Sequence, residues 1–308
     1  MPKILDGAPV RDAIYQECRP RITALRRPPG LAVVLVGHNP ASEIYVRNKV
    51  KASHELGIYS ETLTPPDSIS TEDLLAIVVE LNRRPEIDGI LVQMPLPPQI
   101  DSKRILLAVS PAKDVDGFHP CNVGNLVTGR PGPKSCTPAG IIRLLRYYQI
   151  PIAGRHAVVV GRSDIVGKPM AMLLLHENAT VTICHSKTED LAGVCRQGDI
   201  LVAALGRPGA LTADFIRPGA TVIDVGTNRI VDRAQAARIF RNSKGKLDAF
   251  ERKGNLLVGD LDPIDIAEKA SAYTPVPGGV GLLTIAMLMM NTVEAAERIL
   301  GGLHARPE

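Results

Sequence analysis

The stretch HAVVVGRSDIVGKPM, residues 156–170, combines a buried strand, a glycine break and the start of a helix. In dinucleotide-binding domains a G-x-G-x-x-G turn at this place lets backbone N–H groups approach a pyrophosphate. Here the glycines are Gly161 and Gly167, with Ser163 where a second glycine is usual and one extra residue before the last. The stretch predicts a strand–turn–helix unit. Taken alone, it fits a packing turn as well as a nucleotide site.

The strand of this stretch is one of six apolar runs rich in Val, Ile and Leu. They are LAVVLVG (31–37), DGILVQ (88–93), HAVVVG (156–161), ATVTIC (179–184), DILVAAL (199–205) and ATVIDVG (220–226). Segments with helical spacing separate them. Runs that are apolar on both faces are typical of parallel strands covered by helices. A chain of 308 residues is also long enough for about two domains. We therefore predict an α/β fold with two domains, one of them a Rossmann-like parallel sheet.

Two segments bear on the domain boundaries. Residues 114–140 are dense in Gly, Pro and Asn and lack periodicity, which predicts a long loop between domains. The final helical segment, Thr284 to about Leu300, has no strand after it, so we expect it to pack back on the first domain. The predicted domains are thus residues 1–140 with 284–308, and residues 141–283.

Composition excludes several classes of protein. Apolar residues make up 45% and charged residues 22%, and a net charge of +4 without a basic block does not indicate nucleic-acid binding. Five scattered cysteines without a C-x-x-C pair argue against a disulfide framework or a zinc site, and metal-ligand spacing is absent. The N-terminal residues lack a signal-like apolar region, and LLTIAMLMM is too short to span a bilayer. We expect a cytoplasmic protein without a metal or membrane partner.

The end of the second strand in the Rossmann-like domain indicates which dinucleotide it prefers. An acidic residue usually stands there, about 20 residues after the glycines, and holds the ribose hydroxyls. This chain instead has ATVTICHSKT, in which Ser186 can donate a hydrogen bond and Lys187, with Arg162, supplies positive charge. We predict NADP rather than NAD. The glycine-rich ends ALGRPG (204–209) and DVGTNR (224–229) support a ligand at this edge.

The segment PASEIYVRNKVKASHELG, residues 40–57, predicts a helix that ends at Gly57. Ser42, Tyr45 and Lys49 fall on one face at positions i, i+3 and i+7. Most helical lysines are solvated, so spacing alone leaves Lys49 open between a surface role and a catalytic one.

Two polar positions follow the strand DGILVQ. Gln93 ends the run and precedes three prolines in four residues, which suits a side chain held toward a cleft or a simple strand cap. Asp114 and Asp116 flank a turn in DVDGFHP, where Asp-Gly is also a good turn former. His119 and Cys136 have no nearby partner in the sequence, and we interpret them as structural.

Ten motifs occur in the order seen in the methylenetetrahydrofolate dehydrogenase/cyclohydrolase family, which the chain resembles from about residue 5 to 298. They are ASEIYVRNKVKASHELGI, GILVQMPLP, KDVDGFHP, CTPAG, VVVGRSDIVGKP, VTICHSKT, DILVAALGRPG, VIDVGTNR, VGDLDP and TPVPGGVG. The ordered set is far more specific than any one motif. The resemblance implies NADP-dependent oxidation of 5,10-methylenetetrahydrofolate and hydrolysis of the methenyl product to 10-formyltetrahydrofolate, in one-carbon folate metabolism.

The resemblance also implies residue roles. Lys49 would be the catalytic lysine, Gln93 its hydrogen-bond partner, Tyr45 a stacking surface for the folate and Asp116 the residue that binds the pterin edge. The implied cofactor-binding positions are Gly161, Arg162, Ser163, Ser186 and Thr227. The implied folate-cleft positions are Pro277, Gly278 and Gly279. Family members are commonly homodimers built through the nucleotide domain.

The hydrolysis needs a general base, so Lys49 must be partly uncharged. Burial or the methenyl cation of the substrate would lower its pKa, whereas a nearby Asp116 would raise it.

A few positions depart from the family pattern: Ser135, Asp164, Thr227, Leu282 and Leu283. We expect Asp164 to weaken cofactor binding if its side chain faces the phosphates. Leu282 and Leu283 replace a proline that would stiffen the exit of the folate loop, so we expect less order there.

Three alternatives stay open from sequence. A monofunctional dehydrogenase or cyclohydrolase would show one activity only. A binding or regulatory module would bind the cofactor without turnover, although Lys49, Gln93 and Asp116 are all present. An unrelated two-domain dehydrogenase acting on a shikimate-like acid would share the architecture, yet it would not explain the motifs around Tyr45 and Lys49.

Overall fold

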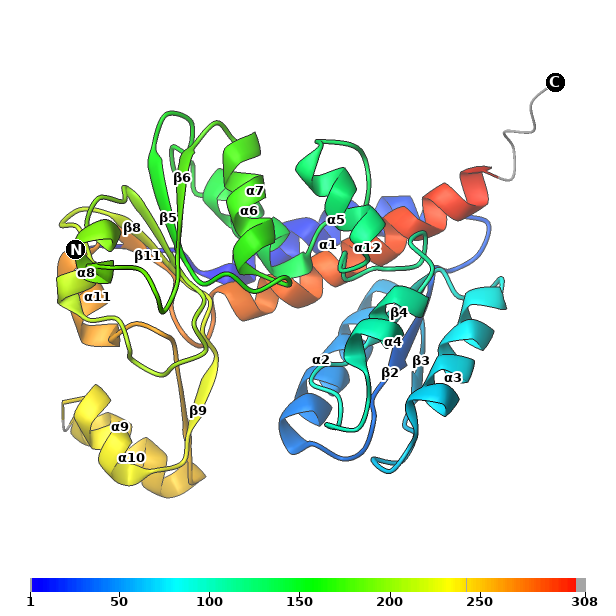
Figure 1. Cartoon of the computed structure of the whole chain (residues 1–308), viewed down its shortest axis with the longest axis horizontal. Coiled ribbons are helices and arrows are strands. Elements are labelled where there is room, and N and C mark those ends of the chain that lie inside the picture. The colour runs from blue at the N-terminus through cyan, green and yellow to red at the C-terminus, as the bar shows by residue number, and fades with distance from the viewer. Residues whose placement is uncertain (1, 242, 303–308) are drawn as a thin grey trace. The chain divides into compact units, whose positions relative to one another are not determined.

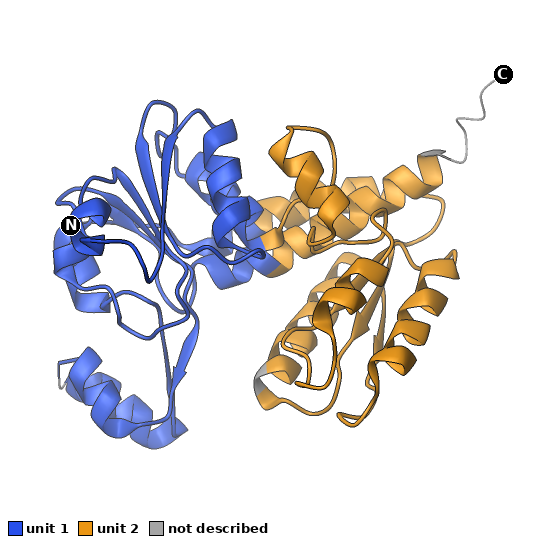
Figure 2. Ribbon diagram, in the orientation of Figure 1, with its two compact units in different colours: residues 1–11, 137–284 blue, residues 12–136, 285–308 orange. Residues whose placement is uncertain are grey.

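The chain folds into two compact units, shown in Figure 2 of a computed structural model that describes residues 2–241 and 243–302. Unit 1 comprises Met1–Arg11 and Thr137–Thr284, and unit 2 comprises Asp12–Cys136 and Ile285–Glu308. The α/β class predicted from the sequence is confirmed, since each unit is built on a parallel sheet with helices on its faces.

Unit 1 contains a six-stranded sheet in the order β1-β11-β8-β7-β5-β6, with every neighbouring pair parallel. Its strands are β1 (Lys3–Ile4), β5 (His156–Val160), β6 (Thr180–Cys184), β7 (Ile200–Ala203), β8 (Thr221–Asp224) and β11 (Ala272–Tyr273). Four of the six apolar runs therefore form the centre and one edge of this sheet. The order reverses direction between β5 and β7, which is where open α/β sheets bind ligands.

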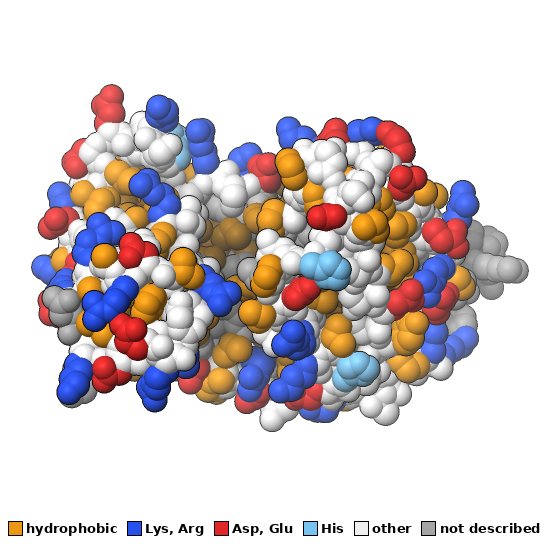
Figure 3. Space-filling model, turned by 90° about the horizontal axis from the view of Figure 1, so that it is seen from below, with side chains coloured by type: hydrophobic (Ala, Val, Ile, Leu, Met, Phe, Trp, Pro, Cys, Tyr) orange, Lys and Arg blue, Asp and Glu red, His pale blue; other side chains and the backbone are white. Residues whose placement is uncertain are grey.

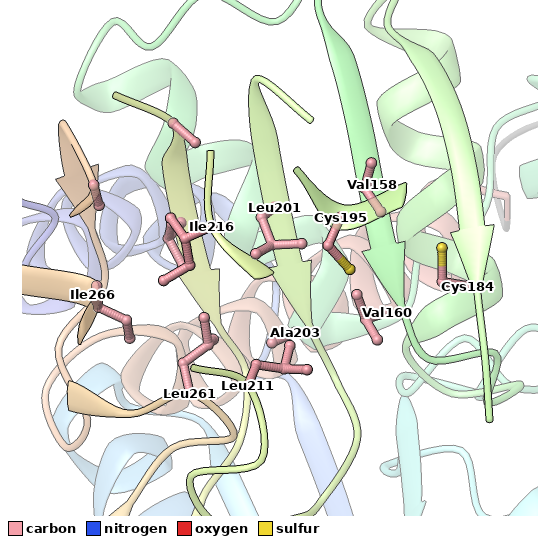
Figure 4. Packing of buried hydrophobic residues seen from close by; sticks show 13 residues of the cluster. Val158, Val160, Cys184, Cys195, Leu201, Ala203, Leu211, Ile216, Leu261 and Ile266 are labelled. Carbon is pink, nitrogen blue, oxygen red and sulfur yellow. The ribbon is translucent and has the colours of Figure 1, made fainter. Parts of the chain in front are cut away.

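Helices cover both faces of the unit 1 sheet. They are α6 (Cys136–Tyr147), α7 (Gly167–His176), α8 (Leu191–Cys195), the 3₁₀ turn η1 (Ala213–Phe215) and α11 (Pro263–Lys269). In Figure 1, α6 and α7 lie on one side of the sheet and α8 and α11 on the other. Figure 4 shows the core on the second side, where Val158, Leu201 and Cys195 pack with Ile266 of α11. All five cysteines are free thiols.

An antiparallel ribbon of β9 (Asn228–Ile230) and β10 (Leu256–Val258) extends from unit 1. Between its strands lie α9 (Arg233–Ile239) and α10 (Lys244–Lys253). This insertion buries its own small cluster, which includes Phe240 and Phe250. An ion pair between Arg241 and Asp265 joins it to α11. These elements were not predicted from the sequence, because each strand has only three residues and α10 is strongly polar.

Unit 2 contains a three-stranded parallel sheet in the order β3-β2-β4, formed by β2 (Gly30–Val34), β3 (Tyr59–Leu63) and β4 (Gly89–Val92). Its helices include α2 (Pro40–Leu56), α3 (Thr71–Arg83), α4 (Ser102–Ala108) and α5 (Pro120–Val127). Leu74 and Val78 of α3 and Ile105 of α4 pack on one face of the sheet, and α2 lies on the opposite side in Figure 1. The edge strand β3 was missed because YSETL has no apolar run.

Two long helices, α1 (Gly7–Ala24) and α12 (Val280–Gly302), continue from unit 1 into unit 2. Within unit 2 they are joined by Arg21, which donates to Glu297 at 2.6 and 2.9 Å. The expected return of the C-terminal helix is thus confirmed. By length and composition alone Val280–Gly301 could cross a membrane, but 67% of that window is buried in the protein, as in a core helix.

Three details differ from the sequence predictions. The segment expected to be one long loop, residues 114–140, contains α5 and the start of α6. Residues 1–11 lie in unit 1, although the sequence placed them with the other domain, because β1 pairs with β11. Leu282 and Leu283 lie in the first turn of α12 rather than in a loop, and Leu283 is fully buried. Their helical position removes the expected loss of loop order.

Side chains of both charges are interspersed over the face shown in Figure 3. No single-sign patch dominates this face, in keeping with the small net charge of +4.

The turn after β5 generates a stability prediction. A Cβ on Gly161, whose φ is +136°, would lie 2.3 Å from the Ala204 carbonyl oxygen. Gly161→Ala should therefore lower the free energy of unfolding by about 3 kcal/mol. Gly154→Ala is the matched control, because Gly154 also has a positive φ, +73°, but open space around it, and should cost about 1 kcal/mol. Urea unfolding measures both, and equal losses would contradict the packing argument.

Candidate functional site

Helix α2 carries buried polar side chains on the face that packs inside unit 2. Asn39 accepts the backbone N–H of Ser42 at 3.2 Å, which caps the helix start, and Pro40 occupies its first position. Ser42 and Lys49 are both buried, with only 8% of Lys49 exposed. The solvated interpretation of Lys49 is therefore excluded by its burial.

The structure brings Lys49 and Gln93 together. The Lys49 Nζ donates to Gln93 Oε1 at 2.8 Å. Gln93 follows β4, and its backbone N–H donates to the Val34 carbonyl at 2.8 Å. Its Nε2 donates to the Met94 carbonyl at 2.7 Å, so the amide oxygen is the atom that faces the lysine. The amide therefore acts as an oriented acceptor for one N–H of Lys49.

Asp116 lies on a turn that is stabilised by hydrogen bonds to the nearby Asp114. The Asp114 carboxylate accepts the backbone N–H groups of Gly117, Phe118 and His119 at 2.8 to 3.2 Å, and the Asn122 amide at 2.8 Å. Asp114 is thus structural, as its turn-forming sequence indicated. Asp116 is half-buried and bonds to no donor among the described residues. Its oxygens are available to a ligand.

Burial shifts both ionisable groups of this cluster toward their neutral forms. It raises the pKa of Asp116 to about 6, against the attraction of Lys49, which lowers it. Burial also lowers the pKa of Lys49, and the nearby Asp116 carboxylate opposes that shift. The sequence left open whether burial or Asp116 has the larger effect on the pKa of Lys49. In the structure burial prevails and the pKa is lowered, which is the direction that a general base needs.

Asn291 of α12 is a residue of this site that the sequence analysis missed. Its Nδ2 donates to the carbonyls of Val115 at 2.7 Å and Lys134 at 2.9 Å, and lies 3.4 Å from Cys136 Sγ. Val115 directly precedes Asp116, so the C-terminal helix fixes the turn that carries the carboxylate. The Cys136 thiol, whose pKa burial raises well above its ordinary value, also donates to Val115. Cys136 is structural, as predicted.

Two further predicted residues in unit 2 have simpler surroundings. Tyr45 lies one turn before Lys49 on α2 and is 38% exposed, which leaves its ring accessible. His119 caps α5, where its Nδ1 accepts the Cys121 N–H at 3.1 Å. The predicted structural role of His119 therefore agrees with its contacts.

In unit 1, the turn from β5 to α7 is built by packing. The Cβ that Gly167 lacks would lie 2.2 Å from the Gly161 carbonyl oxygen, so both glycines are required by close backbone contacts. Ser163 Oγ accepts the N–H groups of Val166 at 3.2 Å and Gly167 at 3.3 Å. These two amides are occupied, and the Ser163 hydroxyl hydrogen remains free to donate. The turn can therefore offer a hydroxyl and the exposed Arg162 to an anion.

The end of β6 adds two more exposed donors. Ser186 and Lys187 lie in the turn after Cys184, and their side chains, like that of Arg162, make no hydrogen bond or ion pair with another described residue. Asp164, which we expected to weaken a phosphate site, is 82% exposed and pairs with Lys168 at 2.5 Å. That pairing offsets its negative charge.

The remaining predicted positions lie in two loops of unit 1. Thr227 is exposed between β8 and β9. Pro277, Gly278 and Gly279 lie between β11 and α12, where Gly279 N–H donates to the Pro275 carbonyl at 2.9 Å. A Cβ on Gly279 would lie 2.7 Å from that oxygen, so the loop closes tightly on itself. Among the described residues no group of three or more His, Cys, Asp or Glu side chains could hold a metal ion.

Comparison with known proteins finds two family matches. The catalytic domain of tetrahydrofolate dehydrogenase/cyclohydrolase matches residues 5–116, and the NAD(P)-binding domain of that family matches residues 135–300. The bifunctional protein FolD of Solibacter usitatus is 71% identical over 98% of this chain and 99% of its own length. FolD of Koribacter versatilis is 63% identical, over 96% of each protein.

Two solved structures are similar in fold to this protein over nearly its whole length. The bifunctional FolD dehydrogenase/cyclohydrolase of Campylobacter jejuni is 41% identical with a TM-score of 0.87, covering 97% of this chain and 99% of that one. The Trypanosoma brucei enzyme, solved with NADP cofactor and an inhibitor, is 36% identical with a TM-score of 0.87, covering 99% and 100%.

Proposed function

The chain belongs to the tetrahydrofolate dehydrogenase/cyclohydrolase family, and we propose which of its residues carry the two reactions of that family. It is an enzyme that oxidises 5,10-methylenetetrahydrofolate with NADP and hydrolyses the 5,10-methenyl product to 10-formyltetrahydrofolate. The observation that carries the assignment is the buried Lys49 ammonium, held by Gln93 and close enough to Asp116 to be shifted by it.

The exposed donors of unit 1 fit NADP. Arg162, Ser186 and Lys187 offer two cations and a hydroxyl that are bonded to no other side chain among the residues the structure describes, and β6 ends without a carboxylate that would repel a 2′-phosphate. With Gly161, Ser163 and Thr227 they would hold the dinucleotide. Held there, NADP would supply the hydride acceptor for the oxidation of the methylene carbon.

We propose Asp116 and Tyr45 as the residues of unit 2 that bind the folate. The Asp116 carboxylate accepts N–H groups from the amide and amino edge of the pterin, and the accessible ring of Tyr45 offers a stacking surface. We assign Pro277, Gly278 and Gly279 as further folate contacts, because a tight loop of two glycines allows the backbone to approach a ligand. Orientation is the main demand of the oxidation step.

The hydrolysis needs proton transfer at Lys49. Water attacks the amidinium carbon, and neutral Lys49 Nζ takes the first proton, while Gln93 Oε1 holds one N–H and so directs the lone pair. When the carbon–nitrogen bond to the folate breaks, the remaining hydroxyl proton leaves as the formyl C=O forms, and the folate nitrogen takes up a proton. The lysine then returns its proton to solvent.

The oligomeric state and the cellular location of the protein are proposed by analogy. We propose a homodimer built through unit 1 and a cytoplasmic location, by analogy with the family.

The function is tested by the initial rates of methenyltetrahydrofolate formation with NADP and with NAD, and by hydrolysis of added methenyltetrahydrofolate above its uncatalysed rate. Both activities should be present, with NADP preferred because of the donors at Arg162, Ser186 and Lys187. A single activity would support the monofunctional alternative. Cofactor binding without turnover would support the binding module, and equal rates with NADP and NAD would remove the assignment of the phosphate site.

Lys49→Gln should reduce cyclohydrolase kcat by at least about 100-fold, because the variant cannot take a proton from water. Lys51→Gln is the matched control, since Lys51 is exposed two residues further along the same helix. The control should keep its rate. Hydrolysis at an undiminished rate in Lys49→Gln would overturn the assignment of the base.

Asp116 should give the reaction a dependence on pH. Below its pKa of about 6 the carboxyl is protonated and loses an acceptor for the pterin edge, so cyclohydrolase kcat/KM should rise as the pH increases through 6. Asp116→Ala should raise the folate KM by about 10-fold or more and abolish this limb of the profile. An unchanged KM, or an unchanged limb, would show that another group binds the pterin.

A further inference from the structure

The carboxyl edge of the unit 1 sheet contains a carboxylate surrounded by backbone N–H groups of its own chain. Asp260, in the segment after β10, is fully buried. Its Oδ2 accepts the N–H groups of Leu205 at 2.5 Å and Gly206 at 3.0 Å, and its Oδ1 accepts that of Arg207 at 2.8 Å. Three successive amides of the loop after β7 therefore converge on one side chain, in the concave arrangement that backbone N–H groups use to bind anions.

The same carboxylate also reaches the loop after β8. Asn228 Nδ2 donates to Asp260 Oδ1 at 2.9 Å, and Asn228 directly follows the predicted cofactor residue Thr227. With four donors and no cation pair among the described residues, the charge of Asp260 is balanced by N–H groups alone. One side chain thus connects the loops after β7 and β8, two of the strand ends at which the sequence predicts the dinucleotide.

A second buried carboxylate holds Asp260 in place. Asp224, the last residue of β8, accepts the backbone N–H groups of Asp260 at 2.8 Å and Gly226 at 3.0 Å through Oδ1, and that of Leu261 at 3.0 Å through Oδ2. The contacts leave no room for side chains nearby: a Cβ on Gly226 would lie 2.4 Å from Asp260 Oδ1. The position of Asp260 is therefore fixed by the end of the sheet itself.

We infer that Asp260 is a positioning residue for NADP, which orders the loops at residues 205–207 and 226–228 before the cofactor binds. The inference rests on the proposed function, because it places the cofactor at these strand ends. If the loops were free, their ordering would take place on binding and weaken it. Asp260 orders these loops in advance, so binding does not have to order them. In this role Asp260 does not itself contact the cofactor.

Asp260→Asn tests this role, because the amide keeps the size of the side chain but turns two N–H donors toward a ring of N–H groups. The Kd for NADP, measured by isothermal titration calorimetry, should rise at least tenfold. Amide hydrogen exchange in residues 205–207 of the cofactor-free protein should become faster. Hydrolysis of methenyltetrahydrofolate, whose proposed base lies in unit 2, should stay within about twofold.

Asp262→Asn is the matched control. Asp262 lies two residues away and caps α11 through the N–H groups of Ile264 and Asp265, a task that Asn performs as well. Its NADP Kd should not change. Should Asp260→Asn fail to fold, Asn228→Ala removes a single donor to Asp260 and should still raise the Kd, by a smaller factor.

An unchanged NADP Kd in folded Asp260→Asn, or an equal rise in Asp262→Asn, would overturn the inference. Failure of the proposed function has a different signature, since the wild-type protein would then not bind NADP at all.

Discussion

The burial of one ammonium group is the constraint on which the chemistry of unit 2 depends. Lys49 has only 8% of its surface exposed, and a buried charge without partners would be strongly destabilising. The chain meets this constraint with an oriented acceptor, Gln93, and a carboxylate, Asp116, rather than with a tight ion pair. A direct ion pair would hold the proton on the lysine, whereas an amide acceptor satisfies one N–H and leaves the pKa low.

Unit 1 accommodates buried charge by another route. Asp224 and Asp260 are both buried carboxylates, and their partners are backbone and amide N–H groups rather than cations. Burial still raises the pKa of Asp224 to about 7, because desolvation outweighs its three donors. Such partners connect loops at fixed positions, so in this unit buried charge organises the backbone. In unit 2 the buried charge belongs to Lys49, the residue we propose as the base of the hydrolysis.

The sequence predicted what local patterns encode. Apolar runs identified β2, β4, β5, β6, β7 and β8, and the capped segment 40–57 identified α2 together with the face that carries Lys49. It did not identify β3, whose edge position permits polar residues, or the inserted helices α9 and α10, which form a separate small core. Asn291 and Asp260 were also missed, because their hydrogen-bond partners are distant in the sequence. Val115 lies 176 residues from Asn291, and Leu205 lies 55 residues from Asp260. Contacts between residues so far apart follow no local spacing rule and form only when the chain has folded.

The pKa shifts of Lys49 and Asp116 fit the proposed role of Lys49 as a base that need not be neutral before the substrate binds. Near pH 7 Asp116, with a pKa of about 6, is mainly ionised, and its charge raises the pKa of Lys49 against the effect of burial. In the proposed complex the Asp116 carboxylate accepts the pterin N–H groups, so its charge would be shared with the ligand and would attract the ammonium less. The methenyl group adds a positive charge that disfavours the ammonium further. Both changes would act only when the substrate of the hydrolysis is bound, so the mechanism we propose populates the base form of Lys49 most when its reaction partner is present.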